Sequence, residues 1–506
     1  MFKQIKVMTF AVSLLLLTTL NSCDLETQVF DQAPSDQFPR TESELLSTVS
    51  SAYTNLGGYY GAPFEINGPS SDEIVVPTRG PDWDDQGSWR SIETHTWTPD
   101  RPGQTNGAWE FGFTGIVNAN LGISRINAST LEIDGKETIV AELRVLRAFY
   151  YYVLCDLFGN VPIITEQSTG QNPAQNTRVE VYNFIVSELR AAIPALPSGS
   201  GTAQYGRMTK GVAFTLLAKT LLNSQVFSGT ARWAEVIPAC DSVINSGAYA
   251  LNPDFMSNFA VGNRNNPFAR RENIMVVPYD GVRQGGNNFH MRTLHYAQQP
   301  QFQLAQSPWN GFCTIAEFYN SFPDGDARKA MWMIGPQRIN GRVITYNDAV
   351  TGETAVPLDF RTTIASLERA TQRDGVRSQK VEIQQGNNRT DQDNHVPIFR
   401  YADVLLMKAE ALFRLGRTAE ALPLVNTVRD RAGLPALASL TADELLAERG
   451  REFAWENLRR NDLIRFDKFA NGTWQFKPVT PKFRELFPIP TQQLARNPSL
   501  RQNTGY

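Results

Sequence analysis

Aromatic and charged residues are concentrated in one short segment, SSDEIVVPTRGPDWDDQGSW, at residues 70–89. Aromatic rings can pack against the apolar faces of sugar rings, while carboxylates, amides and arginines form hydrogen bonds with sugar hydroxyls. This mixture is therefore typical of a site for a neutral glycan. The candidate ligand-binding residues in the segment are Asp72, Arg79, Asp82, Trp83 and Trp89. Trp83 is the strongest of them, because its turn-forming and charged neighbours favour exposure.

Carboxylates and arginines gather again near the C-terminus. Glu448, Glu452 and Glu456 recur at a spacing of four, which places them on one face of a helix. Four arginines lie within reach of them: Arg449, Arg451, Arg459 and Arg460. Glutamates on one helical face point the same way, so they cannot flank a glycosidic bond as two catalytic carboxylates must. We therefore predict a structural ion-pair network that joins helices, and no catalytic residues.

Amphipathic helices, which come in pairs, must position these residues. Apolar positions from Leu143 to Leu157 recur at spacings of three and four and predict a helix that ends at the turn FGNVP. Further helices are predicted over residues 179–193, after Gly206, over 233–244 and, as a pair, over 402–432. Pro238 should kink the 233–244 helix or delay its start. The string AEALFRLGRTAEAL resembles a tetratricopeptide unit, in which each helical hairpin buries its face by stacking on the next.

Two long segments lack this helical pattern. Residues 62–106 and 252–395 are rich in Gly, Asn, Gln, Pro and aromatic residues, with short candidate strands at Asn273–Pro278 and Arg342–Tyr346. Long irregular segments inside a helical protein are usually functional when they are ordered. The predicted fold class is mainly α: tetratricopeptide-like helical hairpins forming an α-α superhelix, with long irregular loops and a few short β-strands.

Composition excludes several classes of partner and site. The 48 basic and 51 acidic side chains nearly balance, which argues against nucleic acid or an anionic lipid surface as a partner. Beyond Cys23 the cysteines are Cys155, Cys240 and Cys313, an odd and scattered set that is no disulfide framework. The four histidines show no metal-ligand spacing, so we predict neither a metal site nor a cofactor.

The N-terminus has the parts of a lipoprotein signal peptide. Lys3 and Lys6 precede a nearly unbroken apolar run, Val7–Leu20, which is too short to span a bilayer. The tetrapeptide LNSC at residues 20–23 resembles the bacterial lipobox, whose cysteine is acylated and becomes the new N-terminus. We predict a signal peptide at 1–22, lipidation of Cys23 and a polar tether over 23–40. An ordinary secretory signal with a chance cysteine is the alternative.

Six blocks in one order make the chain resemble the SusD/RagB family of Bacteroidetes nutrient-binding lipoproteins. The blocks are spread over the chain from residue 142 to the C-terminus. They are ELRVLRAFYYYVLCDLFGNVP at 142–162, GRMTKGVAFTLLAKTLLN at 206–223, FRYADVLLMKAEAL at 399–412, ERGREFAWENLRRNDLIRF at 448–466, LFPIP at 486–490 and NPSLRQNTGY at 497–506. With the lipobox before them, they identify the chain as a member of this family.

The resemblance implies a binding protein without enzymatic activity. Such proteins sit at the outer membrane, lipid-anchored and facing outward, over a SusC-like TonB-dependent transporter. They hand it oligosaccharides or, in some cases, peptides. The family builds its ligand site partly from the loop after the first helices and partly from the later irregular segment. From that later segment we select Arg292, Trp309, Phe312, Tyr319 and Trp332. For any one of these, packing within the loops is an equally good interpretation, whereas Trp233 and Trp455 lie in helical patterns and are predicted to be core.

The resemblance also implies one domain over residues 41–506. Helical repeats are expected over about 41–250 and 396–470, the irregular ligand-binding region over about 251–395 and a C-terminal tail over 471–506.

Two other functions compete with capture of a nutrient. A surface glycoside hydrolase could use Asp82 and Asp84 as its acid pair, although near-neighbour acids in one loop lack an enforced geometry. A structural scaffold would dock only protein through its helical repeats. Ligand binding by the isolated protein separates the scaffold from the binding protein, and product release identifies the hydrolase. The residues do not specify which glycan or peptide is bound.

Overall fold

A computed structural model describes residues 41–101, 103–199, 204–282 and 285–506. The chain divides into two units, Met1–Leu45 and Leu46–Tyr506, and the site discussed below belongs to the second. The predicted signal peptide, the predicted lipidation site Cys23 and the tether up to residue 40 lie outside the described residues. In the described part of the chain, no helix is both long and apolar enough to cross a membrane.

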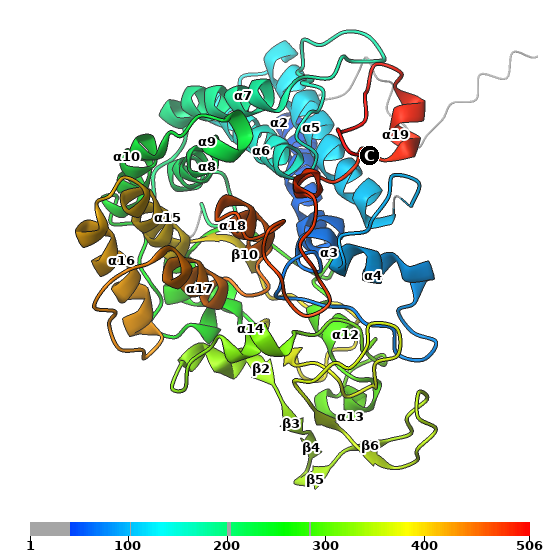
Figure 1. Ribbon diagram of the computed structural model, residues 1–506. Helices are drawn as coiled ribbons and strands as arrows, with labels where there is room; N and C mark the ends of the chain where they lie inside the picture. Colours follow the sequence, from blue (N-terminus) through cyan, green and yellow to red (C-terminus); the bar gives the residue numbers. More distant parts are fainter. Residues whose placement is uncertain (1–40, 102, 200–203, 283–284) are drawn as a thin grey trace, which may run out of the picture. The chain divides into compact units, whose positions relative to one another are not determined.

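A series of helices, each packed on the next, forms the main body of the second unit. In packing order they are α5 (Gly103–Ala128), α6 (Lys136–Leu157), α7 (Arg178–Ala192), α8 (Lys210–Leu222), α10 (Trp233–Ile244), α15 (Tyr401–Arg414) and α16 (Thr418–Arg431). They form the arc in Figure 1 that runs from α5 at the top through α10 at the left to α16. Each helix of the series packs on its neighbours, as in other helical-repeat folds. The predicted fold class is confirmed.

Glycines bring α5 and α6 close together. A Cβ atom at Gly112 would lie 2.4 Å from the Leu154 side chain, and one at Gly115 would lie 2.4 Å from the Tyr150 ring. Only glycine permits this approach of the α5 backbone to the side chains of α6. Helix α5 is absent from the sequence predictions, because the same glycines interrupt its apolar pattern.

The other predicted helices begin and end close to the expected residues. Helix α7 begins at a capping box in which the Thr177 hydroxyl accepts from the backbone N–H of Glu180 and the Glu180 carboxylate accepts from the backbone of Thr177. Helix α10 runs from Trp233 to Ile244 with Pro238 inside it, so the expected delay of its start is wrong. The remaining helices are α2 (Glu42–Thr54), α3 (Ala62–Asn67), α4 (Ser88–Glu93), α9 (Ser224–Ser228), α11 (Pro267–Glu272), α12 (Phe289–Thr293), α13 (Gln299–Phe302), α14 (Ala316–Asn320), α17 (Ala442–Glu452), α18 (Arg459–Arg465) and α19 (Thr491–Arg496).

The chain between α10 and α15 is an insertion into the helical series, because α10 packs directly on α15. The antiparallel pair of β1 (Asn273–Val277) and β10 (Val396–Arg400) closes it near both ends. Its other antiparallel pairs are β2 (Trp332–Met333) with β9 (Arg377–Ser378), β3 (Gly335–Pro336) with β8 (Asp359–Phe360), β4 (Arg338–Ile339) with β5 (Arg342–Val343), and β6 (Thr345–Tyr346) with β7 (Val356–Pro357). The strand predicted at 273–278 is confirmed. The one predicted at 342–346 is two strands, β5 and β6, that pair with different partners. This region occupies the lower part of Figure 1.

A buried ion-pair network joins α17 to the insertion and to the helical series, as predicted. The predicted single helical face is wrong, because α17 ends at Glu452 and Glu456 lies beyond it, where it pairs with Arg400 at 2.7 Å. Glu452 is fully buried and pairs with Arg328 from the insertion at 3.0 Å, with Arg400 at the end of β10 at 2.7 Å, and with Arg431 of α16. Although burial alone would raise the pKa of Glu452, the three arginines hold it well below its usual range. The network therefore stays ionised at neutral pH.

Candidate functional site

Three aromatic rings from the two predicted site segments meet behind one surface. The ring centroids of Trp83 and Trp89 lie 5.6 Å apart, those of Trp83 and Phe312 lie 5.6 Å apart, and those of Trp89 and Phe312 lie 5.3 Å apart, all edge to face. Trp89 and Phe312 are buried, whereas Trp83 is partly exposed. Edge-to-face pairs are a favourable arrangement of aromatic rings. Trp89 and Phe312 therefore support Trp83 from behind.

Two further aromatic residues extend this exposed surface. Trp309 is 38% exposed, and its backbone carbonyl accepts a hydrogen bond of 2.6 Å from the indole N–H of Trp83. Tyr296 is partly exposed and donates a hydrogen bond of 2.5 Å from its hydroxyl to Asp82, the residue before Trp83. We call Trp83, Tyr296 and Trp309 the aromatic platform. Its members come from two chain segments more than 200 residues apart and are joined by these two hydrogen bonds.

The backbone under the platform is held in an unusual conformation. Trp83 itself has φ 60°, and Asn310, the residue after Trp309, has φ 51°. Non-glycine residues in this region cost on the order of 1–3 kcal/mol each and persist only where the surroundings enforce them. Gly311 is one such constraint, because a Cβ there would lie 2.4 Å from the Trp83 ring. The backbone conformation of these loops therefore fixes the positions of Trp83 and Trp309.

Two fully buried arginines support the platform loops from inside. Arg79 donates to the backbone carbonyls of Thr371 and of Asp374, the latter at 2.8 Å. Arg377 donates to the side-chain oxygen of Asn310 at 2.8 Å. Burial and the positive charge of Arg79 lower the pKa of Arg377 to about 9, so its guanidinium still carries its charge at neutral pH. In this conformation, Arg79 stabilises loop backbone rather than the exposed surface on which it was predicted to act.

The remaining predicted residues lie away from the exposed rings. Arg292 is buried and pairs with Glu65 at 2.9 Å. Asp72 is partly buried and accepts both branches of Arg459, at 2.6 and 2.7 Å. Their predicted contact with a ligand stays untested, but both already have a charged partner.

Trp332 and Tyr319 show the two environments of the predicted aromatic residues. Trp332 is 6% exposed and packs edge to face on Phe322 and on Trp455, which is core as predicted. Tyr319, on α14, is partly exposed, with the Lys329 ammonium 5.6 Å from its ring centroid. Trp233 is only partly buried, at the start of α10.

Tyr296 is the platform residue that sequence reasoning missed. Its only local signal is an aromatic residue in an irregular segment, and the contact that places it is with Asp82, 214 residues earlier in the chain. Burial, together with the hydrogen bond to Asp82, raises the pKa of Tyr296 to about 12. The hydroxyl therefore stays protonated and remains a donor at neutral pH.

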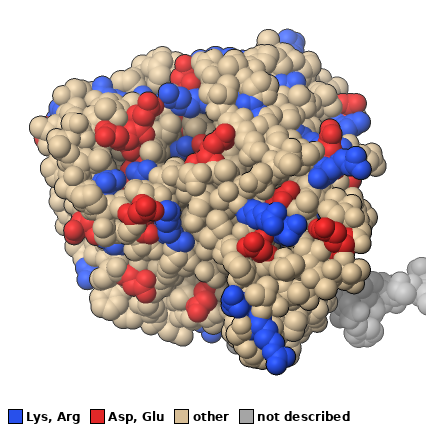
Figure 2. Space-filling model, turned by 60° about the horizontal axis from the view of Figure 1, so that its bottom comes forward, with Lys and Arg blue, Asp and Glu red and all other residues tan. Residues whose placement is uncertain are grey.

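The charges around the platform are mixed rather than of one sign. Asp84 is exposed and pairs with Arg90 at 2.7 Å, and Asp85 accepts from the indole N–H of Trp89 at 2.5 Å. Figure 2 shows acidic and basic side chains interspersed over the described face at the bottom of the molecule, with most of that face uncharged. Within the described ranges, no group of three or more His, Cys, Asp or Glu side chains could hold a metal ion. Such a surface suits a neutral ligand better than a strongly charged one.

The fold and the platform define a class: a helical-repeat protein whose inserted loops present exposed aromatic rings. Two sequence profiles of known families match the chain. A sequence profile described as "SusD family" matches residues 271–506, and one described as "Starch-binding associating with outer membrane" matches residues 76–222. The chain belongs to the SusD/RagB family.

Relatives and solved structures agree with this assignment. The starch-binding protein SusD of Bacteroides thetaiotaomicron is 26% identical, over 89% of this chain and 86% of its own length. A SusD-like protein of Formosa agariphila is 25% identical, over 100% of this chain and 99% of its own. Surface glycan-binding protein A of Bacteroides thetaiotaomicron, solved in complex with laminarihexaose, superposes with a TM-score of 0.73 at 21% identity, over 91% of this chain and 99% of its own. That structural likeness supports the fold.

Proposed function

We propose that this protein captures oligosaccharides at the cell surface on the aromatic platform of Trp83, Tyr296 and Trp309. The observation that carries the proposal is that exposed Trp309 and partly exposed Trp83 are joined by a hydrogen bond of 2.6 Å from the Trp83 indole N–H to the Trp309 backbone carbonyl. Exposed tryptophan is costly to leave in water, and here the loops enforce that exposure at the cost of two strained residues. A sugar ring stacked on the platform would cover this apolar surface.

The groups around the rings also suit sugar hydroxyls. Asp82 and Asp84 are carboxylates at the rim, but each has a partner: Asp82 accepts from Tyr296 and Asp84 pairs with Arg90. Such fixed acceptors can orient a ligand, whereas a hydrolase needs one carboxylic acid and one carboxylate placed across a glycosidic bond. This supports binding over hydrolysis. The names of the relatives, which include a starch-binding protein and a laminarin-binding SusD-like protein, point in the same direction.

The family assignment leads to a place and a partner. The protein would be anchored through a lipid on Cys23 to the outer membrane, facing outward. It would deliver its ligand to a SusC-like TonB-dependent transporter. The family profile named for association with the outer membrane supports this location. Co-purification of a transporter with the lipidated protein, and its loss in a Cys23→Ala variant that still binds ligand, would separate anchoring from binding.

The function is tested by direct binding to the purified chain without its signal peptide. An array of neutral and charged glycans, together with a peptide library, is screened first, and the tightest oligosaccharide is titrated by calorimetry. Trp309→Ala should weaken that binding about tenfold or more, because truncating an aromatic anchor typically costs above 1–2 kcal/mol.

The matched control is Phe268→Ala, which removes another exposed aromatic ring, 56% exposed on α11. It should leave the affinity unchanged. The proposal fails if the wild-type chain binds no glycan, or if Trp309→Ala and Trp83→Ala both bind as wild type. Binding of peptides alone would place the protein with the peptide-capturing members of the family.

A further inference from the structure

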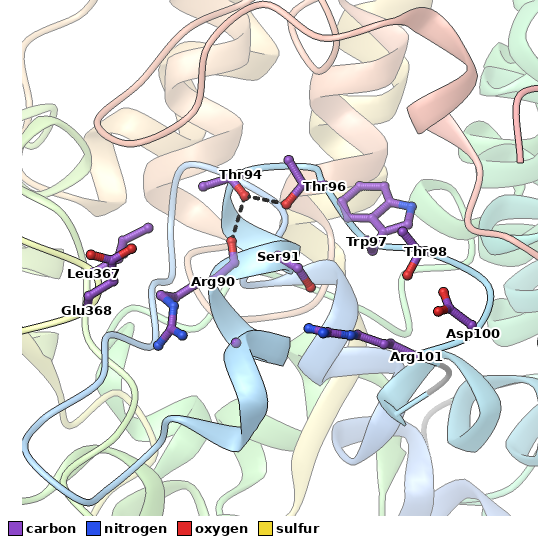
Figure 3. A pocket seen from close by; sticks show the side chains of 11 residues that line it. Arg90, Ser91, Thr94, Thr96, Trp97, Thr98, Asp100, Arg101, Leu367 and Glu368 are labelled. Atoms are coloured by element: carbon purple, nitrogen blue, oxygen red, sulfur yellow. Dashed lines mark hydrogen bonds between the residues drawn. The ribbon is translucent and has the colours of Figure 1, made fainter.

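A second pocket, separate from the platform, is formed around α4 and the extended chain that follows it. Its volume is about 560 Å³. The side chains that matter below are those of Arg90, Thr94, Thr96, Thr98, Arg101 and Glu368 (Figure 3). We call it the threonine pocket. Its size lies within the range of ordinary small-ligand sites, and no platform residue lines it.

The threonines form a fixed wall, because they alternate with anchored aromatic residues. His95 and Trp97 are 2% and 3% exposed, so their rings point into the protein. Trp97 is tied down further by its indole N–H, which donates to the hydroxyl of Tyr506 at 2.6 Å. On the other side of the chain, the hydroxyls of Thr94 and Thr96 lie 2.9 Å apart and share a hydrogen bond, which Figure 3 draws. A wall held from behind in this way presents hydroxyls at set positions, as a preorganised binding site requires.

The charges in the pocket balance. Two basic residues, Arg90 and Arg101, and two acidic ones, Asp100 and Glu368, line it. A hydrogen bond from the hydroxyl of Thr98 lowers the pKa of Asp100, so this carboxylate is ionised at neutral pH. Arg90 is partly neutralised by Asp84, 2.7 Å away. A single anion or cation would therefore meet a repelling partner as well as an attracting one.

The lining selects a hydroxyl-rich ligand that is recognised by hydrogen bonds. The threonine hydroxyls can accept, the arginines donate and the carboxylates accept, so the lining offers both donors and acceptors to sugar hydroxyls. Among the described lining residues, the one aromatic ring, Trp97, is buried and the one aliphatic side chain, Leu367, is 8% exposed, so neither offers an open face for stacking. An apolar peptide side chain would gain little here.

The threonine pocket and the platform share one segment of chain. Arg90 donates to the hydroxyl of Thr78 at 2.6 Å, and that hydroxyl lies 3.4 Å from the backbone carbonyl of Trp83. Trp89 supports the platform, while its neighbour Arg90 lines the pocket. We propose that the threonine pocket is a second saccharide subsite, which takes a neutral sugar unit of the same glycan that stacks on the platform. The proposal rests on the glycan-binding function proposed above.

The test compares a long and a short ligand on a variant that keeps the fold. Thr96 and Thr98 are exposed, so Thr96→Val with Thr98→Val removes two hydroxyls at nearly constant shape. The probes are the tightest-binding hexasaccharide of the glycan array and the disaccharide of the same linkage, both titrated by calorimetry. The double variant should bind the hexasaccharide about fivefold or more weakly, because each net hydrogen bond is worth roughly a factor of two to ten. It should bind the disaccharide, which covers only the platform, like wild type.

The control is Thr427→Val, an exposed threonine on α16 far along the helical series. It should change neither affinity. If the double variant binds both probes as wild type while Trp309→Ala weakens both, the second subsite is refuted and the proposed function stands. Equal weakening of both probes by the double variant also refutes an auxiliary role, since the pocket would then be the primary site. A wild-type chain that binds no glycan overturns the proposed function itself, and with it this inference.

Discussion

The ion-pair network at α17 and the aromatic platform each place side chains in an environment that is unfavourable for them, charged groups in the interior and aromatic rings in water. In the network, charged side chains are completely buried: Arg400 and Glu452 are 1% and 0% exposed and lie 2.7 Å apart. In the platform, aromatic side chains are left partly in water, and Trp309 is 38% exposed. Burying charge and exposing indole are each unfavourable alone, so each must be offset by something specific.

The compensation differs between the two regions. In the network it comes from within the protein, because Arg400 meets Glu272, Glu456 and the backbone carbonyl of Glu452. At the platform it is incomplete, because Trp309 is left 38% exposed and Trp83 and Tyr296 are left partly exposed. A region that is satisfied internally is structural, whereas one that is left unsatisfied at the surface is where a ligand would act.

Removing one buried charge from the ion-pair network should strongly destabilise the fold. Arg400→Leu leaves the buried carboxylates of Glu272, Glu452 and Glu456 with one cation fewer, and each of them lies within 2.8 Å of that guanidinium. Breaking a buried pair by deleting one partner typically costs about 3–5 kcal/mol. We expect the free energy of unfolding, measured by urea denaturation, to fall by about that amount.

The control for this comparison is an exposed pair of the same type. Arg417 and Glu420 lie 2.7 Å apart with side chains 47% and 56% exposed, so Arg417→Leu should change stability by less than about 1 kcal/mol. If Arg400→Leu does not fold, Arg400→Lys keeps a charge and should fall between wild type and the unfolded variant. Equal stability of Arg400→Leu and Arg417→Leu would show that the network does not stabilise the fold.

Two tryptophans from the same irregular region sharpen the contrast. Trp332→Ala removes a buried ring from its contacts with Phe322 and Trp455 and should cost about 3–5 kcal/mol of unfolding free energy. Trp309→Ala removes an exposed ring and should cost less than about 1 kcal/mol, while its effect appears in glycan affinity. Thermal unfolding and calorimetric binding measured on both variants check this. A large stability loss in Trp309→Ala would identify it as a packing residue.

Local patterns predict the helices and the charged network well, because their signals lie within one or two turns. The spacing of Glu448 and Glu452 is a property of one helix, α17, whereas Glu456 lies beyond its end. Arginine is the natural partner of a buried carboxylate. Helix α5 is not predicted, and the reason is also local. Its glycines allow close packing against α6, but they interrupt the apolar pattern by which a helix is recognised.

The site is predictable only in part, because its geometry comes from contacts that are distant in sequence. The segment of Asp82 and Trp83 is recognisable from composition, and Trp309 is a plausible choice from the later segment. The Arg79 side chain is buried because it donates to the backbone carbonyls of Thr371 and Asp374, almost 300 residues later in the chain. The sequence around Arg79 does not indicate these partners. Trp332 and Trp309 look alike in sequence, and only their packing partners distinguish them.

A buried carboxylate without a cation extends the comparison to pH. Glu73 is 1% exposed, accepts from the backbone N–H of Trp455 at 3.0 Å, and has its pKa raised by burial to about 8. In the unfolded chain its pKa is about 4.3. Between these values the folded state holds a proton that the unfolded state has lost, so stability falls as pH rises through this window. Glu73→Gln should therefore be more stable than wild type, by an amount that grows from pH 5 to pH 8 to on the order of 2–4 kcal/mol.

Urea denaturation of both proteins at several pH values measures this difference. Glu137→Gln, at an exposed position on α6, serves as the control and should follow the wild-type pH dependence. The ion-pair network has the opposite pH dependence of stability. The arginines hold the pKa of Glu452 well below its usual range, so its contribution is complete above about pH 4.3 and is lost only as pH falls further. A gap between Glu73→Gln and wild type that does not vary with pH would contradict the assignment of a neutral Glu73.

The smallest expected effect concerns the hydrogen bond that holds the edge of the platform. Asp82→Asn keeps the shape and an acceptor for the Tyr296 hydroxyl, 2.5 Å away, but removes the negative charge. Hydrogen bonds to a charged acceptor are roughly twice as strong as neutral ones, so the ring should be held less firmly and glycan affinity should fall about two- to fivefold. Calorimetric titration with the tightest oligosaccharide measures this change. Asp324→Asn, which weakens the pair of this fully exposed carboxylate with Lys329 at 3.2 Å, is the control and should bind as wild type. An unchanged affinity in Asp82→Asn, alongside a tenfold loss in Trp309→Ala, would restrict the platform to its two tryptophans and leave Tyr296 as support.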